Sequence, residues 1–254
     1  MVPRCLTIAG SDSGGGAGIQ ADLKAFAAAG CFGMSAIVAL TAQNTREVRA
    51  VHEVPPEFVR AQLDAVFDDL GADSAKTGML FSAAIVETVA DALEGRGMPL
   101  VVDPVMVASS GARLLRDDAV ETLVRRLFPL ATVITPNLPE ARALAGEGEP
   151  AELAKRLHDL GAPAVIVTGG HADKPEDVLY DGRELLRIPV ERHETGATHG
   201  AGCTHSATLA ALLARGFVLA EAAREAARIA SEAVANGLAG LGGGEGPVSV
   251  LRLR

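Results

Sequence analysis

Short apolar runs recur along the chain, and each ends at glycine, proline or a polar residue. The runs cover residues 6–9, 36–40, 100–102, 133–134 and 165–167. Runs this short and this continuously apolar are typical of parallel strands that are covered on both faces. We therefore predict buried, parallel strands at these positions.

Helical periodicity fills the stretches between these runs. Apolar residues fall on one helical face in residues 19–27, 58–70 and 85–93, and the alanine-rich residues 209–234 have the same period. Because strand and helix alternate, we predict an α/β fold, a three-layer α/β/α sandwich around a mostly parallel sheet. No linker, repeat or charge block divides the chain, so we expect residues 1–254 to form a single domain.

Open parallel sheets bind ligands at the carboxyl ends of their strands. Polar residues stand at or near several of these predicted ends, and their position alone selects them as candidates. They are Ser11, Asp12, Gln43, Asn44, Lys76, Asp103, Asn137, Glu140 and Thr168.

Composition narrows the class of protein. The 254 residues carry a formal net charge of −9, and only 3% are aromatic. The acidity argues against a nucleic-acid or anionic-membrane partner, and the shortage of rings argues against stacking on single-stranded nucleic acid. The 28 glycines accompany 48% hydrophobic residues, a combination unlike that of disordered chains. We therefore expect the glycines to serve backbone geometry.

Cysteine, histidine and hydropathy patterns indicate where the protein works. Three cysteines form neither a disulfide framework nor a paired metal motif, and the six histidines are scattered in surface-like contexts. No apolar run approaches the length of a membrane span. We expect a cytoplasmic protein.

The common nucleotide-binding motifs are absent, but a different turn takes their place. Neither G-x-x-x-x-G-K-[ST] nor G-x-G-x-x-G occurs. Gly200, Ala201 and Gly202 allow a tight turn, and the N–H groups at the start of the following helix form a site for a phosphoryl group. Cys203 lies at the same terminus, where we expect the helix dipole to lower the pKa of its thiol. An ordinary glycine-rich turn and a small buried cysteine are the alternatives.

This turn and several other segments resemble the ribokinase-like superfamily of ATP-dependent small-molecule kinases, in which a G-x-G-[DC] turn forms the anion hole. Cysteine in place of aspartate is similar to the hydroxymethylpyrimidine/phosphomethylpyrimidine kinase branch of thiamine biosynthesis. The further matching segments are residues 7–24, 41–45, 75–79, 102–106 and 135–140. They follow one another in family order, so the resemblance covers nearly the whole chain.

The resemblance implies that ATP phosphorylates 4-amino-5-hydroxymethyl-2-methylpyrimidine and then its monophosphate. Gln43 matches the residue that hydrogen-bonds the aminopyrimidine, and an amide both donates and accepts as that ring edge requires. Gly10, Met79 and Val105 match the lining of the ring pocket, although plain core packing explains Met79 and Val105 nearly as well. Asp22 lies in a matched motif, but its helical position also allows it to face solvent.

The same resemblance implies a Mg²⁺ and triphosphate site. Asp103 and Glu140 match the carboxylates near the metal, and Asn137 belongs to the same N-x-x-E motif. Magnesium usually takes one or two carboxylates and shares substrate phosphates. Thr168 and Thr198 offer hydroxyl groups to the nucleotide. A loop-capping aspartate and a glutamate that complements the helix dipole are the alternatives for the two carboxylates.

Cys203 matches the catalytic position. As a thiolate it would take the proton of the substrate hydroxyl, while the N–H groups of residues 200–202 stabilise the transferring phosphoryl. The chain departs from the family pattern at Thr168 and Ser109, where lysine is frequent, and at Ala201, where threonine is usual. The missing lysines remove positive charges that would stabilise the ATP phosphates, and Lys76 is the remaining cation candidate nearby. The efficiency of the second phosphorylation is therefore left open.

Two other functions compete with this one. A pyridoxal kinase of the same lineage would accept a similar flat, hydroxymethylated ring, although Gln43 favours the pyrimidine. A non-catalytic vitamin-precursor binding protein would keep the pocket without turnover, but the presence of Asp103, Glu140 and Cys203 argues against it.

Three expectations concern the surface. We interpret the glycine-rich residues 237–246 as a surface turn without function. Residues 171–177 and 191–198 are expected to be flexible flaps near the nucleotide. The resemblance also implies a homodimer.

Overall fold

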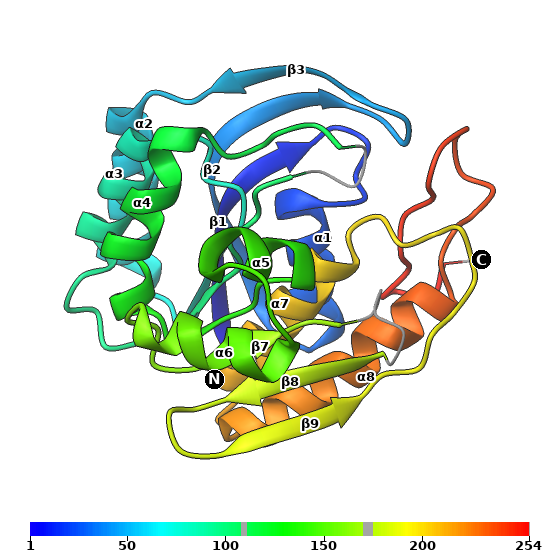
Figure 1. Cartoon of the computed structure of the whole chain (residues 1–254). Coiled ribbons are helices and arrows are strands. Elements are labelled where there is room, and N and C mark those ends of the chain that lie inside the picture. The colour runs from blue at the N-terminus through cyan, green and yellow to red at the C-terminus, as the bar shows by residue number, and fades with distance from the viewer. Residues whose placement is uncertain (108–110, 170–174, 254) are drawn as a thin grey trace.

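Figure 1 shows the protein as a computed structural model, which describes residues 1–107, 111–169 and 175–253. The strands are β1 (Arg4–Asp12), β2 (Phe32–Gln43), β3 (Val48–Glu53), β4 (Ser74–Thr77), β5 (Leu100–Val102), β6 (Val133–Ile134), β7 (Val165–Val167), β8 (Glu176–Tyr180) and β9 (Leu185–Pro189). The helices are α1 (Gly18–Ala28), α2 (Pro56–Ala65), α3 (Ala83–Leu93), α4 (Asp117–Arg126), α5 (Leu138–Ala145), α6 (Pro150–Asp159), α7 (Ala201–Ala214) and α8 (Leu219–Ala235). A π-helical turn (Val66–Leu70) follows α2, and a 3-10 turn (Phe128–Leu130) follows α4.

The strands of the described ranges join one sheet in the order β3-β2-β1-β4-β5-β6-β7-β8-β9. From β2 to β7 all neighbouring strands are parallel. Antiparallel strands are added at the two edges, β3 beside β2 at one and β8 with β9 beside β7 at the other. The carboxyl ends of the parallel strands therefore lie at one edge of the sheet.

Helices cover both faces of this sheet. The larger apolar cluster lies between the sheet and α2, α3, α4, α5 and α6, whereas the second lies under α1, α7 and α8 (Figure 1). The predicted three-layer α/β/α fold is confirmed. One sheet running through the chain suits the expectation of a single domain, and that assignment stays a prediction.

The predicted strands are all present, but the edge strands were missed, and so was the central strand β4, whose sequence Ser-Ala-Lys-Thr is not an apolar run. Most side chains of β3 are partly or fully exposed, and β9 alternates between buried and exposed positions, so neither forms a continuous apolar run. Antiparallel edge strands keep one face in water, which hides them from a search for buried runs. Part of the expected flap at 171–177 is wrong as well, because Glu176 and Asp177 begin β8. Residues 171–174 lie outside the described residues.

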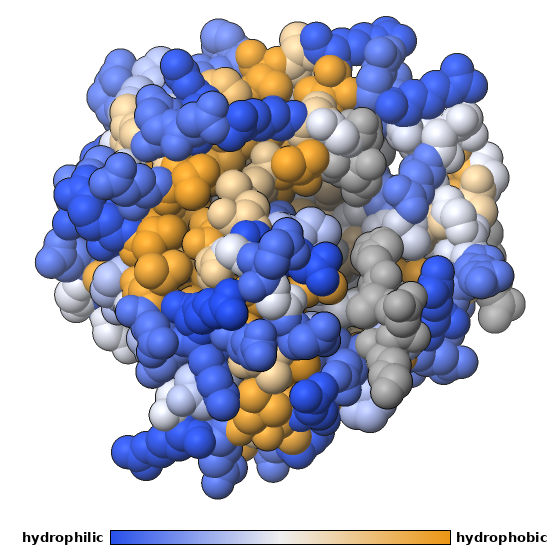
Figure 2. Space-filling model, in the orientation of Figure 1, coloured by the Kyte–Doolittle hydropathy of each residue, from blue (hydrophilic) through white to orange (hydrophobic). Residues whose placement is uncertain are grey.

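Hydrophilic and apolar side chains occupy different parts of the surface. Hydrophilic side chains form most of the rim of the face seen in Figure 2, and apolar side chains are visible in the hollow beside α4. None of the helices in the described ranges is both long and apolar enough to cross a lipid bilayer.

Candidate active site

A buried ion pair lies beneath the carboxyl ends of β1, β4 and β5. Lys76 Nζ lies 2.9 Å from Asp22 Oδ1 and 3.9 Å from Asp103 Oδ2, and both Lys76 and Asp22 are 0% exposed. Thr7 Oγ1 donates to Asp22 Oδ2 at 2.6 Å. Burial acts against the charge on Lys76, but the charges of Asp22, Cys203 and Asp103 together with the hydrogen bond to Asp22 outweigh it and raise the pKa of the ammonium group.

The position of Asp22 corrects one expectation. The side chain does not face solvent, and it is fully engaged by Lys76 and Thr7 rather than open to a substrate. Its geometry assigns it to neutralising Lys76. The sequence showed the motif, but not that the two charges face each other across α1 and β4.

Two carboxylates follow β5 and begin α5. Ser206 Oγ donates to Asp103 Oδ2 at 2.8 Å. Glu140 forms a capping box with Asn137: its carboxylate accepts from the Asn137 backbone N–H at 3.0 Å, and Asn137 Oδ1 accepts from Glu140 N at 2.8 Å. Burial and the nearby charge of Asp103 raise the pKa of Glu140 to about 8. The amide oxygen of Asn137 is therefore already used as a helix cap.

These carboxylates provide a donor set for a divalent cation. Among the described residues no group of three or more histidine, cysteine, aspartate or glutamate side chains is arranged to hold a metal ion. Two buried carboxylates suit Mg²⁺, which usually takes only one or two from the protein and completes its shell with phosphate oxygens and water. Asp103 and Glu140 fit that pattern.

The predicted anion hole lies at the start of α7. Gly200 is the N-cap with φ +84°, and a Cβ there would lie 1.8 Å from the carbonyl oxygen of Gly16, so only glycine fits. At Gly202, in contrast, a Cβ would meet nothing within 4 Å. The Ala201 N–H donates to Thr198 O, whereas those of Gly200, Gly202 and Cys203 donate to no acceptor within the described ranges. The free donors are therefore these three N–H groups, and Ala201 is not one of them.

Cys203 is half-buried just inside this turn. Burial of its sulfur raises the pKa of the thiol to about 12, and the charge of Lys76 and a hydrogen bond from Gly18 N only partly oppose this. The expected lowering by the helix dipole is therefore wrong for the substrate-free protein. The sequence indicated the helix terminus, but not that Asp22 and Asp103 lie close enough to disfavour a thiolate.

The predicted ring pocket is divided between two places. Gly10 lies beside Met79, since a Cβ at Gly10 would lie 3.1 Å from Met79 Sδ. Met79 and Val105 both pack into the larger apolar cluster, so core packing accounts for them as well as ring contact does. Gln43 ends β2 and lines a cavity of about 310 Å³ together with Asn44, Thr45, Arg46, His199, Gly244 and Glu245.

Two buried histidines were missed, because the sequence suggested surface positions. His199 Nε2 lies 2.9 Å from Asp12 Oδ2, and the Asp12 carboxylate also accepts from the N–H groups of Gly14, Gly16 and Ala17. Burial opposes the charge of Asp12, but these hydrogen bonds hold its pKa below its ordinary value. Asp12 thus connects the glycine-rich loop after β1 to the turn before α7. Its place at a strand end was the only sequence signal.

The second buried histidine lies on the other side of α7. His205 Nε2 is 3.4 Å from Asp177 Oδ2, and Asp177 Oδ1 accepts from Gly169 N at 3.0 Å. Thr168 adjoins this contact at the end of β7, and its backbone N–H donates to Pro136 O. This contact places α7 beside the strand end where a nucleotide contact was predicted, although neither ring nitrogen of His205 makes a hydrogen bond within the described residues.

The remaining predicted residues have different outcomes. The Thr198 hydroxyl donates to Glu245 rather than being free for phosphate. Residues 191–198 have no regular secondary structure, and their flexibility stays a prediction. Ser109 lies outside the described residues.

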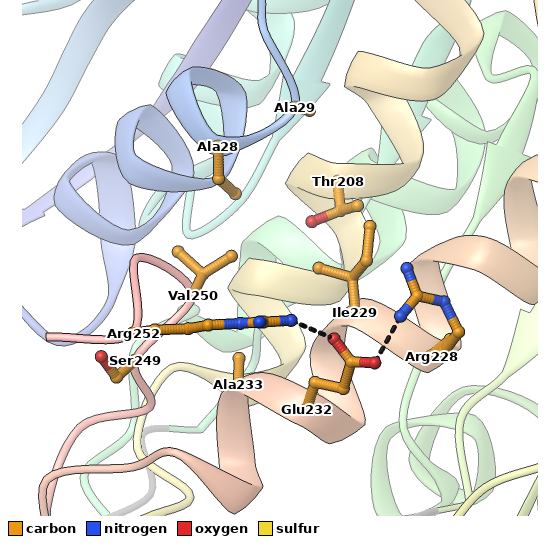
Figure 3. Close-up of a pocket in the computed structure, with 11 residues that line it drawn as sticks. Ala28, Ala29, Thr208, Arg228, Ile229, Glu232, Ala233, Ser249, Val250 and Arg252 are labelled. Atoms are coloured by element: carbon orange, nitrogen blue, oxygen red, sulfur yellow. Dashed lines mark hydrogen bonds and ion pairs between the residues drawn. The ribbon is translucent and has the colours of Figure 1, made fainter.

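A further cavity of about 260 Å³ lies between α1, α7, α8 and the segment that follows α8 (Figure 3). Arg228 and Arg252 both reach Glu232 at its rim. None of the predicted site residues lines it.

Comparison with known proteins shows the family of this chain. The family model of phosphomethylpyrimidine kinase matches residues 12–249. The chain belongs to the phosphomethylpyrimidine kinase family. The matched span includes every predicted site residue except Gly10 and Ser11, and the resemblance seen in the sequence is confirmed.

Individual members of the phosphomethylpyrimidine kinase family and related structures agree with this. Hydroxymethylpyrimidine/phosphomethylpyrimidine kinase of Rhizobium meliloti (strain 1021) is 51% identical over 98% of this chain and 97% of its own. The ADP complex of Bacillus subtilis pyridoxal kinase has a TM-score of 0.90 and 39% identity, covering 100% of both chains. Phosphomethylpyrimidine kinase from Clostridium difficile 630 has a TM-score of 0.81 and 38% identity, covering 91% of this chain and 99% of its own.

Proposed function

We propose that the protein uses ATP to phosphorylate the hydroxymethyl group of 4-amino-5-hydroxymethyl-2-methylpyrimidine, and then the resulting monophosphate, in thiamine biosynthesis. The observation that carries this proposal is the turn before α7, where free N–H groups and the open space at Gly202 lie close to Cys203 and Asp103. The identity of 51% to a hydroxymethylpyrimidine/phosphomethylpyrimidine kinase supports the choice of substrate.

The backbone does most of the work in this proposal. The N–H groups of Gly200, Gly202 and Cys203 would stabilise the oxygens of the transferring phosphoryl group as negative charge builds on them. Gln43 would hold the ring so that the hydroxymethyl oxygen faces this turn. Phosphoryl transfer passes through a loose transition state, so positioning and charge stabilisation matter more than early proton removal.

Cys203 would act beside the attacking oxygen. With a pKa of about 12 it is a thiol near neutral pH, so it would donate or share a hydrogen bond with the hydroxymethyl oxygen rather than arrive as a thiolate. Lys76 lies close enough to Cys203 to favour negative charge there as the reaction proceeds. Lys76 is also a buried positive charge near the site, in a chain that has threonine at position 168, where lysine is frequent in the family.

Asp103 and Glu140 would hold a Mg²⁺ ion between the protein and the nucleotide. When bound, the ion supplies positive charge that neutralises the phosphate oxygens. Ser206 fixes the orientation of Asp103, and the capping box fixes Glu140. Thr168, at the end of β7, would contact the nucleotide.

A pyridoxal kinase remains the second candidate because the Bacillus subtilis pyridoxal kinase has nearly the same fold. A coupled assay of ADP release separates the candidates when hydroxymethylpyrimidine, its monophosphate and pyridoxal are each offered with and without Mg²⁺. We expect the highest kcat/KM with hydroxymethylpyrimidine and no turnover without Mg²⁺. A higher kcat/KM with pyridoxal would identify the protein as a pyridoxal kinase. Absence of ADP release with all three compounds would support a non-catalytic binding protein.

The resemblance also supports two coarser proposals, a homodimer and a cytoplasmic location. Light scattering after gel filtration should give twice the chain mass of 26.0 kDa. A monomer in that measurement would contradict the first of these. Fractionation of cells should recover the protein with cytoplasmic markers.

A further inference from the structure

The segment after α8 does not behave as a free surface turn. We call residues 238–249 the C-terminal strap. Its backbone pairs with the residues before α7: His199 N donates to Gly246 O, Val248 N donates to His199 O, and Gly246 N donates to Gly196 O. Figure 1 shows the strap, in red, beside the yellow segment that leads into α7. Residues 239–244 are exposed turns as predicted, but the backbone pairing shows that the strap is attached to the segment before α7; that these residues lack a function stays a prediction.

Three successive glycines bring the strap against the loop that follows β2. A Cβ at Gly244 would lie 2.0 Å from Thr45 O, one at Gly243 would lie 2.0 Å from Arg46 Nη2, and one at Gly242 would lie 2.3 Å from Thr45 Oγ1. Gly244 N also donates to Thr45 Oγ1 at 3.2 Å. This loop begins directly after Gln43, so the strap contacts the carrier of the proposed ring-binding residue.

The tight contacts with this loop are made by residues 242–244, whereas Gly246 packs against Leu238 within the strap itself. At Gly240, earlier in the same strap, a Cβ would meet nothing within 4 Å. Gly240 and Gly244 both have ordinary negative φ values, so neither needs glycine for its backbone conformation. They differ in their surroundings, because Gly244 approaches the backbone of Thr45 and Arg46 and Gly240 approaches nothing.

Glu245 joins the strap to the other half of the site. Its carboxylate accepts from the Thr198 hydroxyl, two residues before the left-handed Gly200, and it lines the same cavity as Gln43. Gly200 is held on one side by the Gly16 carbonyl and on the other by the turn that the strap supports. The strap is thus in contact with both the Gln43 loop and the residues directly before the anion hole, Gly196, Thr198 and His199.

We propose that the C-terminal strap sets the distance between the pyrimidine ring and the anion hole, with Gly244 and Glu245 as its positioning residues. The proposal rests on the function proposed above, because that function requires the ring at Gln43 and the phosphoryl group at Gly202 to be placed together. A displacement of about 1 Å between reacting groups costs about 100-fold in rate. Neither residue touches the reacting atoms, and both act through the segments that do.

The first test compares two alanine variants of the strap. We expect Gly244→Ala to lower kcat/KM for hydroxymethylpyrimidine by about tenfold or more, with the KM for ATP changed less than about twofold. Gly240→Ala, the matched control, should keep wild-type kinetics and thermal stability. Equal kinetics of the two variants would overturn the proposal. An inactive wild-type protein would instead overturn the proposed function.

Amide hydrogen exchange tests the strap without any substrate. In Gly244→Ala, but not in Gly240→Ala, exchange should be faster in residues 43–47 and 197–203 while the strands keep their protection. Unchanged exchange in those two segments would contradict the coupling even if the enzyme proved inactive. Faster exchange in every element would mean general destabilisation, and the proposal would then fail unless the Glu245 variants below support it.

The Glu245 link has its own control. Glu245→Ala should lower kcat, whereas Glu245→Gln, which keeps an oxygen that can accept from Thr198, should recover at least half of it. Thr198→Val should cost no further activity in the Glu245→Ala background, because the two residues act through one hydrogen bond. Additive losses, or no recovery with glutamine, would exclude Glu245 as a positioning residue.

Discussion

One buried ammonium group and two buried carboxylates surround the thiol of Cys203. Lys76 favours a negative sulfur, Asp22 and Asp103 oppose it, and burial sets the outcome by raising the pKa to about 12. Under the proposed function the residue would therefore act as a thiol that hydrogen-bonds the hydroxymethyl oxygen, and not as a base that is already deprotonated near neutral pH.

Replacement of this thiol should slow the chemical step. We expect Cys203→Ala to lower kcat by about tenfold or more while ATP still binds, since the backbone donors remain. Steady-state kinetics and nucleotide titration measure the two effects separately. Cys203→Ser keeps a hydrogen-bond donor, so its kcat should lie between those of Cys203→Ala and the wild type. A near-normal kcat for the alanine variant would remove Cys203 from the mechanism.

Glu140 makes the stability of the protein depend on pH. Its folded pKa of about 8 lies above its ordinary value of 4.5, so the folded state binds the proton more tightly than the unfolded state does. This contribution to stability is present at low pH and is lost as pH rises from about 4.5 to about 8. We expect Glu140→Gln, which can keep the capping box, to flatten that part of the profile.

Urea unfolding of both proteins at several pH values, without nucleotide or metal, measures this difference. The comparison removes the titration of Glu140 together with its repulsion of Asp103, whereas the other titrating groups are shared. A wild-type and a variant curve that run parallel between pH 5 and 8, a window set by these pKa values, would show that Glu140 titrates normally.

At the scale of elements, α7 combines a buried body with an exposed beginning. Residues from Thr204 to Leu212 are buried, so the helix is fixed between the sheet, α1 and α8. Its first turn carries both the left-handed Gly200 and the open Gly202. The two glycines are close in sequence, but the fold requires glycine only at 200, whereas at 202 only the proposed function requires it.

Alanine substitutions should separate these two requirements. Gly200→Ala forces a methyl group onto the Gly16 carbonyl and demands an unfavourable φ, so we expect a loss of stability of about 2 kcal/mol or more together with activity. Gly202→Ala should leave the melting temperature nearly unchanged and lower kcat, because its methyl group enters the space proposed for the phosphoryl group. Equal losses of stability in the two variants would contradict this assignment.

The same elements show what a sequence can and cannot reveal. Most strands with both faces buried were predictable from their apolar runs, although β4, with the sequence Ser-Ala-Lys-Thr, was not. The rule that ligands bind at strand ends selected Asp12, Lys76 and Asp103. β3 was not predicted because its side chains are partly or fully exposed to water and form no apolar run. Glu245 escaped because its partner Thr198 is 47 residues away and the strap pairs through its backbone, which leaves no side-chain pattern. The thiol pKa escaped because burial is a property of the folded packing.

At the scale of the whole molecule, the site is built from opposite ends of the chain. Asp12 and His199 are 187 residues apart, and Gly16 contacts Gly200 across a similar separation. The central strands supply a rigid edge between them. Helices on both faces of that edge determine how the two ends approach each other.

Sequence separation of this size has a consequence for the order in which the protein folds. Contacts between distant segments close the largest loops, so they form late and open early. The sheet can be complete while the Asp12–His199 contact and the strap are still open. We expect enzymatic activity to disappear at a lower urea concentration than the circular dichroism of the helices. Loss of activity and of circular dichroism at the same urea concentration would mean that the two ends and the sheet form one cooperative unit. The active site would then form in the same transition as the rest of the fold.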